Sequence, residues 1–192
     1  MGGGVINNSN NVKVLVALAN GFEEIEAITP IDILRRAGYE VTIAGVDGLE
    51  ITGAHDIKVH CDILIEDAGI DYQAMLLPGG GLGSKNLAAS WAVNEKMLLI
   101  ANSGAVLAAI CAAPAVVLGP AGMLEGHKAV CFPGAEVNMP DFTFGTERVC
   151  TDGNLITARA AGCAVEFALA IISKLSGVEL SKYIAQTILF EE

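Results

Sequence analysis

The chain has 192 residues, of which 53% are hydrophobic and 17% charged, and this balance excludes a disordered chain and favours one α/β domain. Its formal net charge of −11 argues against nucleic acid and anionic membrane surfaces as partners, because both attract basic patches. No apolar run reaches the roughly 18 residues that a membrane-spanning helix needs, and the first residues lack the pattern of a secretory signal.

The cysteines indicate the compartment of the protein, and the organisation of the chain indicates its number of domains. Five cysteines at scattered spacing favour reduced thiols, and we expect a cytoplasmic protein. No Cys-x-x-Cys pair and no close Cys/His cluster supports a zinc site, so no metal is expected. Because no repeat or linker interrupts the chain, we interpret residues 1–11 as a flexible tail and residues 12–192 as a single domain.

Apolar runs alternate with helical patterns along the chain, which predicts a mostly parallel sheet covered on both faces. In the first helix, Ile25, Ile28, Ile31 and Leu34 recur on one face. In the first half of the chain, the pattern predicts a strand at 12–18, a helix at 24–37, a strand at 40–44, a hairpin or edge strand at 50–60, a strand at 74–77 and a helix at 91–101. In the second half, it predicts a strand at 106–110, a short helix at 113–118, short strands at 128–132, 149–151 and 155–157, and helices at 165–175 and 178–186.

Cys111 stands where the buried strand 106–110 turns sharply into a helix that Pro114 opens. Small residues on either side, Ala109 and Ala113, leave room for such a turn, which has the logic of a nucleophile elbow with Cys in place of Ser. Free backbone N–H groups and the positive end of a helix dipole favour a thiolate there, and the dipole alone lowers a thiol pKa from about 8.5 to about 7. The alternative is a buried core cysteine.

The glycine run at 79–83 follows another buried strand but does not fit a phosphate loop, because Ser84 precedes Lys85. We interpret it as a flexible loop whose N–H groups are available for an oxyanion hole, the alternative being a plain tight turn. Glu26, flanked by Ile25 and Ala27, is a candidate buried carboxyl with a raised pKa; the alternative is a helix-start carboxylate.

The three histidines are His55, His60 and His127. None follows Cys111 directly, so the sequence contains no obvious Cys–His dyad, and surface positions are the ordinary expectation for each of them.

Taken together, these segments resemble the ThiJ/PfpI superfamily, in the branch of the parkinsonism-associated protein deglycase and its bacterial relatives. The resemblance runs in order from about residue 12 to 187. The segments that carry it are Val-Leu-Val-Ala-Leu-Ala-Asn-Gly-Phe-Glu-Glu-Ile-Glu-Ala at 14–27, Asp-Ile-Leu-Arg-Arg-Ala-Gly at 32–38, Leu-Pro-Gly-Gly at 77–80, Ala-Ala-Ile-Cys-Ala-Ala-Pro at 108–114 and Glu-Phe-Ala-Leu at 166–169.

The resemblance implies a flavodoxin-like three-layer sandwich, a homodimer and activity without cofactors. It places the family nucleophile on Cys111, its buried protonated glutamate on Glu26, and its oxyanion amides on Gly80 and Ala112. An ionised Glu26 would cancel the effect of the dipole on the thiol, so such a site requires Glu26 to hold its proton and donate it to sulfur.

Three further positions are candidate pocket or dimer-interface residues by the same resemblance. An interface arginine falls on Arg159, another appears as His55, and a histidine that some members carry near the cysteine aligns with Phe132. Ala112 stands where the peptidases of the superfamily place a histidine, which argues against proteolysis.

The function expected is a glyoxalase or deglycase acting on small dicarbonyls such as methylglyoxal, in oxidative and carbonyl stress protection. The alternative is a redox-sensing, chaperone-like protein whose Cys111 is oxidised to sulfinate. A cysteine peptidase is less favoured.

Overall fold

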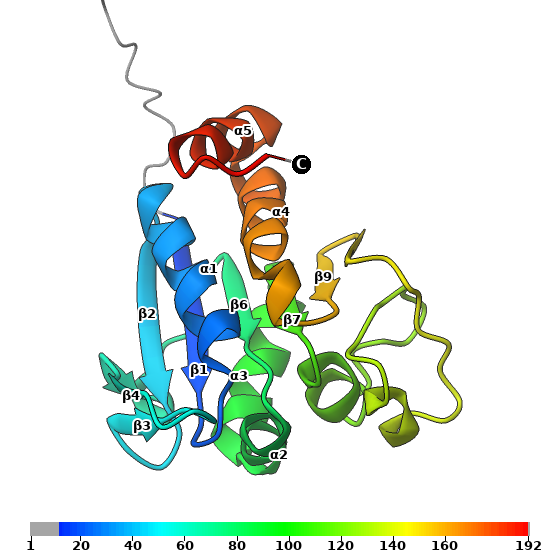
Figure 1. Cartoon of the computed structure of the whole chain (residues 1–192). Coiled ribbons are helices and arrows are strands. Elements are labelled where there is room, and N and C mark those ends of the chain that lie inside the picture. Colours follow the sequence, from blue (N-terminus) through cyan, green and yellow to red (C-terminus); the bar gives the residue numbers. More distant parts are fainter. Residues whose placement is uncertain (1–11, 192) are drawn as a thin grey trace, which may run out of the picture.

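The computed structural model describes residues 12–191, shown in Figure 1, so the tail expected at 1–11 lies outside the described residues. Within that range no helix is long and apolar enough to cross a membrane. The central strands are β1 (Lys13–Leu18), β2 (Glu40–Gly45), β5 (Ile63–Leu64), β6 (Ala74–Leu77), β7 (Val106–Ile110), β8 (Val149–Asp152) and β9 (Leu155–Ala158). A separate hairpin joins β3 (Glu50–Thr52) to β4 (Lys58–His60), and the α-helices are α1 (Glu24–Arg36), α2 (Gly81–Ala89), α3 (Trp91–Asn102), α4 (Ala164–Ser176) and α5 (Val178–Thr187).

The seven central strands lie in the order β5-β2-β1-β6-β7-β9-β8. Every neighbouring pair is parallel except β8 and β9, which form an antiparallel pair at one edge. The carboxyl ends of β1, β6, β7 and β9 therefore meet at one edge of the sheet, which is where sites form in open α/β folds. This is the flavodoxin-like α/β fold that the sequence predicts.

Helices cover both faces of this sheet (Figure 1). Between the helices and the sheet, one cluster of buried apolar side chains lies on each face. Along β1, Val14 and Val16 face the layer that contains α1 and α4, while Leu15 and Ala17 face the layer that contains α3. Because successive strand residues point to opposite faces, a strand covered on both sides must be apolar throughout. The continuous apolar runs in the sequence follow from this arrangement.

The buried stripe of α1 differs from the expected one. Ile25 and Ile28 are 53% and 42% exposed, whereas Ile31 and Leu34 are buried together with Ala27. The helix is rotated relative to the expectation, so small residues contact the sheet near its start and two isoleucines face outward.

The glycine run is not a flexible loop, because α2 begins at Gly81. Gly83 is required in this helix because a Cβ there would lie 2.7 Å from the backbone N and Cα of Phe22. Close packing of α2 against the segment after β1 therefore outweighs the poor helix propensity of glycine.

The strand expected at 128–132 does not form. Ala129 and Val130 are almost fully buried, but β8 occupies the place beside β9, and the Val130 N–H donates to the side-chain oxygen of Thr157 at 2.9 Å. The segment is a buried loop, so its apolar composition is explained by burial and not by pairing with a neighbouring strand.

Candidate active site

The chain turns sharply at Cys111, directly after β7. Cys111 has a left-handed backbone with φ of 66°, and its N–H donates to the Ala158 carbonyl at 2.9 Å. Such a conformation costs a non-glycine residue about 1–2 kcal/mol. Ala109 and Ala113 are fully buried on either side, and a π-helical turn at Pro114–Leu118 follows. The elbow that the sequence predicts at this position is confirmed as a backbone feature.

Glu26 lies in the first turn of α1 and is held against the segment after β6. It is 1% exposed, and its Oε2 accepts the N–H of Gly79 at 3.0 Å. The Glu23 N–H in turn donates to the Gly79 carbonyl at 3.1 Å, and the Glu26 N–H donates to Glu23 Oε2 at 2.8 Å. These three hydrogen bonds form a closed ring that fixes the position of the Glu26 carboxyl.

Two glycines allow the parts of the site to approach one another. A Cβ at Gly79 would collide with the Glu26 carboxyl and with the Cβ of Cys111. Gly80 has φ of 92°, and a Cβ there would collide with the backbone of Gly21. Glycine is therefore required at both positions by space and, at Gly80, also by conformation.

The carboxyl of Glu26 faces the thiol of Cys111. Glu26 Oε1 is buried and, among the described residues, makes no hydrogen bond, while the Cys111 thiol and the backbone of Ala161 are close enough to lower the pKa of the carboxyl. Burial raises the pKa of Glu26 to about 7, and the charge of Glu23 acts in the same direction. A buried carboxyl at this pKa can both donate and accept a proton near neutral pH.

The surroundings of Cys111 act on its thiol in opposing directions. Burial, followed by the charge of an ionised Glu26, raises the pKa of the Cys111 thiol to about 12, while the N–H groups of Gly80 and Ala112 lower it. The amides act as expected, but the net direction is the reverse of the fall to about 7 that the dipole argument predicts. Formation of a thiolate therefore depends on which of the two groups carries the proton that they share.

Of the further candidates, Phe132 is bonded to the elbow through its backbone, and Arg159 follows the strand residue that is bonded to it. The Phe132 N–H donates to the Cys111 carbonyl at 2.7 Å, and its side chain is 46% exposed. Arg159 follows Ala158 at the end of β9, and its guanidinium donates to the Thr146 carbonyl at 3.1 Å. Both residues thus lie at the same sheet edge as Cys111.

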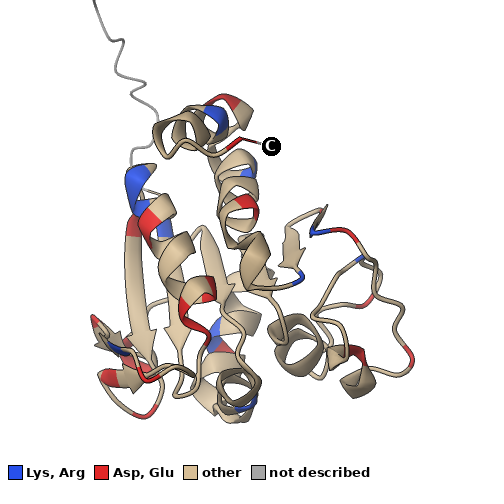
Figure 2. Cartoon of the chain, in the orientation of Figure 1, with Lys and Arg blue, Asp and Glu red and all other residues tan. Residues whose placement is uncertain are grey.

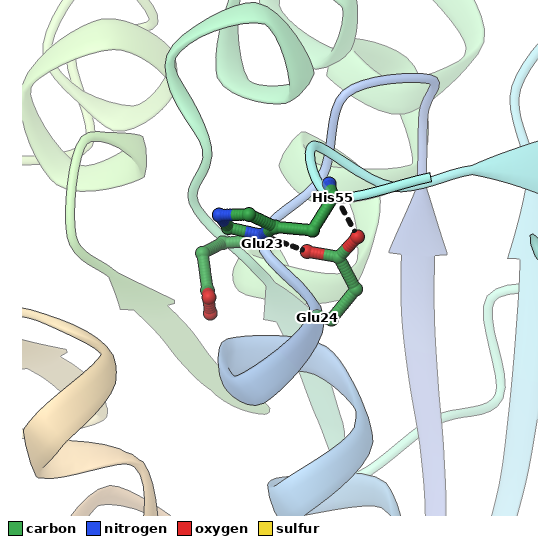
Figure 3. Close-up of side chains that lie close together, drawn as sticks. All are labelled: Glu23, Glu24 and His55. Atoms are coloured by element: carbon green, nitrogen blue, oxygen red, sulfur yellow. Dashed lines mark hydrogen bonds and ion pairs between the residues drawn. The ribbon is translucent and has the colours of Figure 1, made fainter. Parts of the chain in front are cut away.

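His55, the remaining candidate, is tied to the start of α1, as Figure 3 shows. Its backbone N–H donates to Glu24 Oε1 at 2.6 Å, and its Nδ1 lies 2.7 Å from Glu24 Oε2. Side-chain ligand atoms of Glu23, Glu24 and His55 lie within 4.8 Å of one another. Because both oxygens of Glu24 are already bonded to His55, an ion pair between hairpin and helix accounts for this cluster without a metal.

Two features of the site were missed in the sequence. Glu23 acts as the N-cap of α1, and its only signal is its position three residues before Glu26. The pairing of His55 with Glu24 spans 31 residues and has no local signal.

Comparison with known proteins agrees with this arrangement. The DJ-1/PfpI family model matches residues 12–174. Protein DJ-1 homolog B of Arabidopsis thaliana is 39% identical over 88% of the chain, which spans 40% of that longer relative, and the Parkinson disease protein 7 homolog of Danio rerio is 37% identical over 94% of the chain and 98% of its own length.

Solved structures and an archaeal relative extend the comparison. The structure of oxidised Toxoplasma gondii DJ-1 superposes with a TM-score of 0.89 at 38% identity, covering 94% of this chain and all of that one. A deglycase of Pyrococcus abyssi is 31% identical over 79% of the chain and 92% of its own length. The chain, with its elbow cysteine after β7 and its carboxyl in the first turn of α1, belongs to the DJ-1/PfpI family.

Proposed function

We propose that the protein is a stress-protective enzyme of the glyoxalase or deglycase type that acts on small dicarbonyls through Cys111, without a cofactor. The observation that carries the proposal is the pair of buried Glu26 and half-buried Cys111 at the sheet edge, beside the backbone N–H groups of Gly80 and Ala112. The deglycase of Pyrococcus abyssi supports the same class of reaction.

The pair is suited to sharing one proton. A carboxylate with a buried, unpartnered Oε1 is unfavourable, whereas a protonated Oε1 can donate to the sulfur. The proton on Glu26 removes the charge that opposes ionisation of the thiol, and the amides of Gly80 and Ala112 then favour the thiolate. The nucleophile is thus activated by proton transfer within the pair.

A neutral dicarbonyl fits the charge around this edge. Figure 2 shows acidic residues at the start of α1 and on the β3–β4 hairpin, and the chain has 22 acidic against 11 basic residues. An anionic substrate would be repelled by this surface, while an uncharged aldehyde would not.

With methylglyoxal, the Cys111 sulfur attacks the aldehyde carbon and forms a hemithioacetal. The N–H groups of Gly80 and Ala112 stabilise the oxyanion, and Glu26 moves a proton from that carbon to the neighbouring carbon. The resulting thioester is hydrolysed by water, so methylglyoxal and water give lactate and free enzyme.

Turnover of methylglyoxal to lactate by the purified protein tests the proposal. We expect lactate from the wild type without glutathione, and none above background from Cys111→Ala. Cys150→Ala is the matched control, because Cys150 lies on the edge strand β8, two strands away from β7, and this variant should turn over normally. Turnover that survives Cys111→Ala, or its absence from the wild type, would refute the assignment.

A redox sensor is the second candidate, and the oxidised form of the Toxoplasma gondii relative favours it. The same shared proton that activates Cys111 for carbonyl addition makes the sulfur oxidisable to sulfinate. An inactive wild type whose Cys111 is selectively oxidised by mild peroxide would favour this candidate over the enzyme.

A homodimer is also proposed, with the outer face of α1 at its interface. Ile25 and Ile28 are exposed there, and a hollow of 570 Å³ between α1 and α4 is lined by Ile28, Ile33 and Val165. Sedimentation should give twice the mass of one chain, and Ile25→Asp with Ile28→Asp should reduce it to one. A wild-type mass of one chain at micromolar concentration would contradict the proposal.

A further inference from the structure

A second cysteine belongs to an apolar cluster that the candidate nucleophile contacts. Cys131 is 4% exposed and belongs to a small apolar cluster with Ala112, Ala115 and Ala135. Cys111 packs against the same cluster. Since Ala112 and Ala115 belong to the turn that follows Cys111, Cys131 packs against the elbow itself.

The segment that carries Cys131 is also bonded to the elbow through its backbone. The N–H of the next residue, Phe132, donates to the carbonyl of Cys111 at 2.7 Å. This bond holds the segment of residues 131 and 132 beside the elbow, and a disulfide requires its two Cα atoms to lie about 4.4–6.8 Å apart. Residues 127–132 belong to no helix or strand, so a small backbone adjustment there breaks no ladder.

The remaining thiols are placed less favourably. Cys61 follows the β3–β4 hairpin, and Cys150 lies on the edge strand β8, where its sulfur contacts the Lys128 carbonyl at 3.6 Å. Cys163 is buried at the start of α4, and its N–H donates to Ala160, not to the elbow. Cys163 is an equally buried control: it belongs to the large core cluster, which Cys111 also contacts, but its backbone is not hydrogen-bonded to the elbow.

We propose that Cys131 is the resolving thiol of Cys111: after Cys111 is oxidised, the two residues form a reversible disulfide. The proposal rests on the reactive Cys111 of the proposed function. A hydroperoxide first transfers an oxygen to the Cys111 sulfur: the S–O bond forms, the O–O bond breaks, and water or an alcohol leaves. The Cys131 sulfur then attacks the Cys111 sulfur and loses its proton, the S–O bond breaks, and hydroxide and that proton leave as water.

The two thiols have different roles because their surroundings differ. Burial, followed by the charge of Glu136, raises the pKa of the Cys131 thiol to about 11, and Arg159 acts in the other direction. Neither acts as a hydrogen-bond partner, unlike Glu26 beside Cys111. Cys131 is therefore a thiol at neutral pH, and it loses its proton as it attacks a sulfenic acid formed at Cys111. The disulfide protects Cys111 from further oxidation to sulfinate, and thiol reductants restore the free Cys111 thiol.

Peptide mass mapping of peroxide-treated protein tests this proposal. The wild type is treated with an equimolar amount of hydrogen peroxide, blocked with N-ethylmaleimide and digested without reduction. Trypsin cleaves after Lys128, so Cys111 and Cys131 fall in different peptides. We expect one cross-linked peptide pair, two hydrogens lighter than the separate peptides, which disappears on reduction with dithiothreitol.

Variants then test whether Cys131 itself reacts with oxidised Cys111. Cys131→Ser, and Cys131→Ala as an alternative that matches the alanine-lined cluster, should yield no cross-link and a several-fold larger fraction of Cys111 sulfinate. Cys163→Ser should form the cross-link as the wild type does. Sulfinate at Cys111 without any cross-link in the wild type overturns the resolving role but leaves the reactive thiol in place. No modification of Cys111 at all overturns both.

Discussion

Two carboxyl groups in one helical turn behave in opposite ways in this protein. Glu24 and Glu26 are 6% and 1% exposed, so burial acts against the ionised form of each. In Glu24, hydrogen bonds from the side chain and backbone of His55 outweigh burial and lower its pKa. In Glu26, burial prevails and raises the pKa to about 7.

The difference lies in both the partner and the depth of burial, because burial opposes ionisation of Glu26 more strongly than that of Glu24. Glu24 faces a histidine that is cationic when protonated and ties the hairpin to α1, so an ionised carboxylate is stabilised. Glu26 faces a thiol and the N–H of Gly79, and burial outweighs their effect, so the proton is retained to a higher pH. One carboxyl thus serves as a structural ion-pair partner, while the other is available for proton transfer.

Amide substitutions at the two positions test this contrast most strongly through catalysis. We expect Glu26→Gln to lower methylglyoxal turnover by roughly 100-fold or more, because it removes the transferable proton but keeps the shape. Glu24→Gln should leave turnover within a few-fold of the wild type. Steady-state lactate formation measures the turnover of both variants. Equal losses of turnover in the two would contradict the different roles of Glu24 and Glu26.

The pH dependence of stability should differ between wild type and Glu26→Gln. Because the folded pKa of Glu26, about 7, exceeds the ordinary 4.5, this group stabilises the fold fully below about pH 4.5, and the stabilisation disappears as pH rises through 7. The difference in free energy of unfolding, Glu26→Gln minus wild type, should therefore be about 3 kcal/mol more positive above pH 7 than at pH 4. Urea unfolding at both pH values measures it, and a constant difference would mean that Glu26 titrates normally.

Glu24→Gln should show the reverse trend with a smaller amplitude. Its pKa is lowered in the fold, so the carboxylate stabilises the protein above the ordinary pKa of 4.5, and this contribution is lost as pH falls through the folded value. Loss of a buried charged partner should cost about 1–3 kcal/mol near pH 6. Unfolding curves at pH 6 and in acid would reveal the shrinking difference; a variant as stable as the wild type at pH 6 would contradict it.

The smallest expected effect is in the titration of His55 itself. Its hydrogen bond to Glu24, together with the charge of that carboxylate, raises the pKa of His55 above 6.5. Proton NMR should find the His55 ring titrating above 6.5 in the wild type and nearer to 6.5 in Glu24→Gln. An unchanged titration in the variant would show that the pair does not persist in solution.

The sheet and the elbow could be predicted from the sequence because both leave local signals. Strands covered on both faces are apolar throughout, so β6 and β7 were predicted with their observed bounds. A cysteine between such a strand and Pro114, with alanines on either side, fits few conformations other than a sharp turn.

The remaining features depend on contacts between distant segments. The helix that begins at Gly81 forms because it packs against Phe22, a contact that outweighs propensity. The segment 128–132 has the composition of a strand, but β8 occupies the sheet position beside β9. The proton balance of Cys111 could not be obtained from a helix dipole alone, because burial and Glu26 contribute more.

The left-handed backbone of Cys111 places stability and reactivity in conflict at one position. Glycine adopts φ of 66° without the steric penalty that a cysteine meets there. A library of variants sorted only for heat resistance would therefore tend to enrich glycine at position 111 and discard the sulfur. Sorting for chemistry would retain the cysteine at the expense of some folding free energy, so thermostabilised versions of this protein need an activity screen at every round.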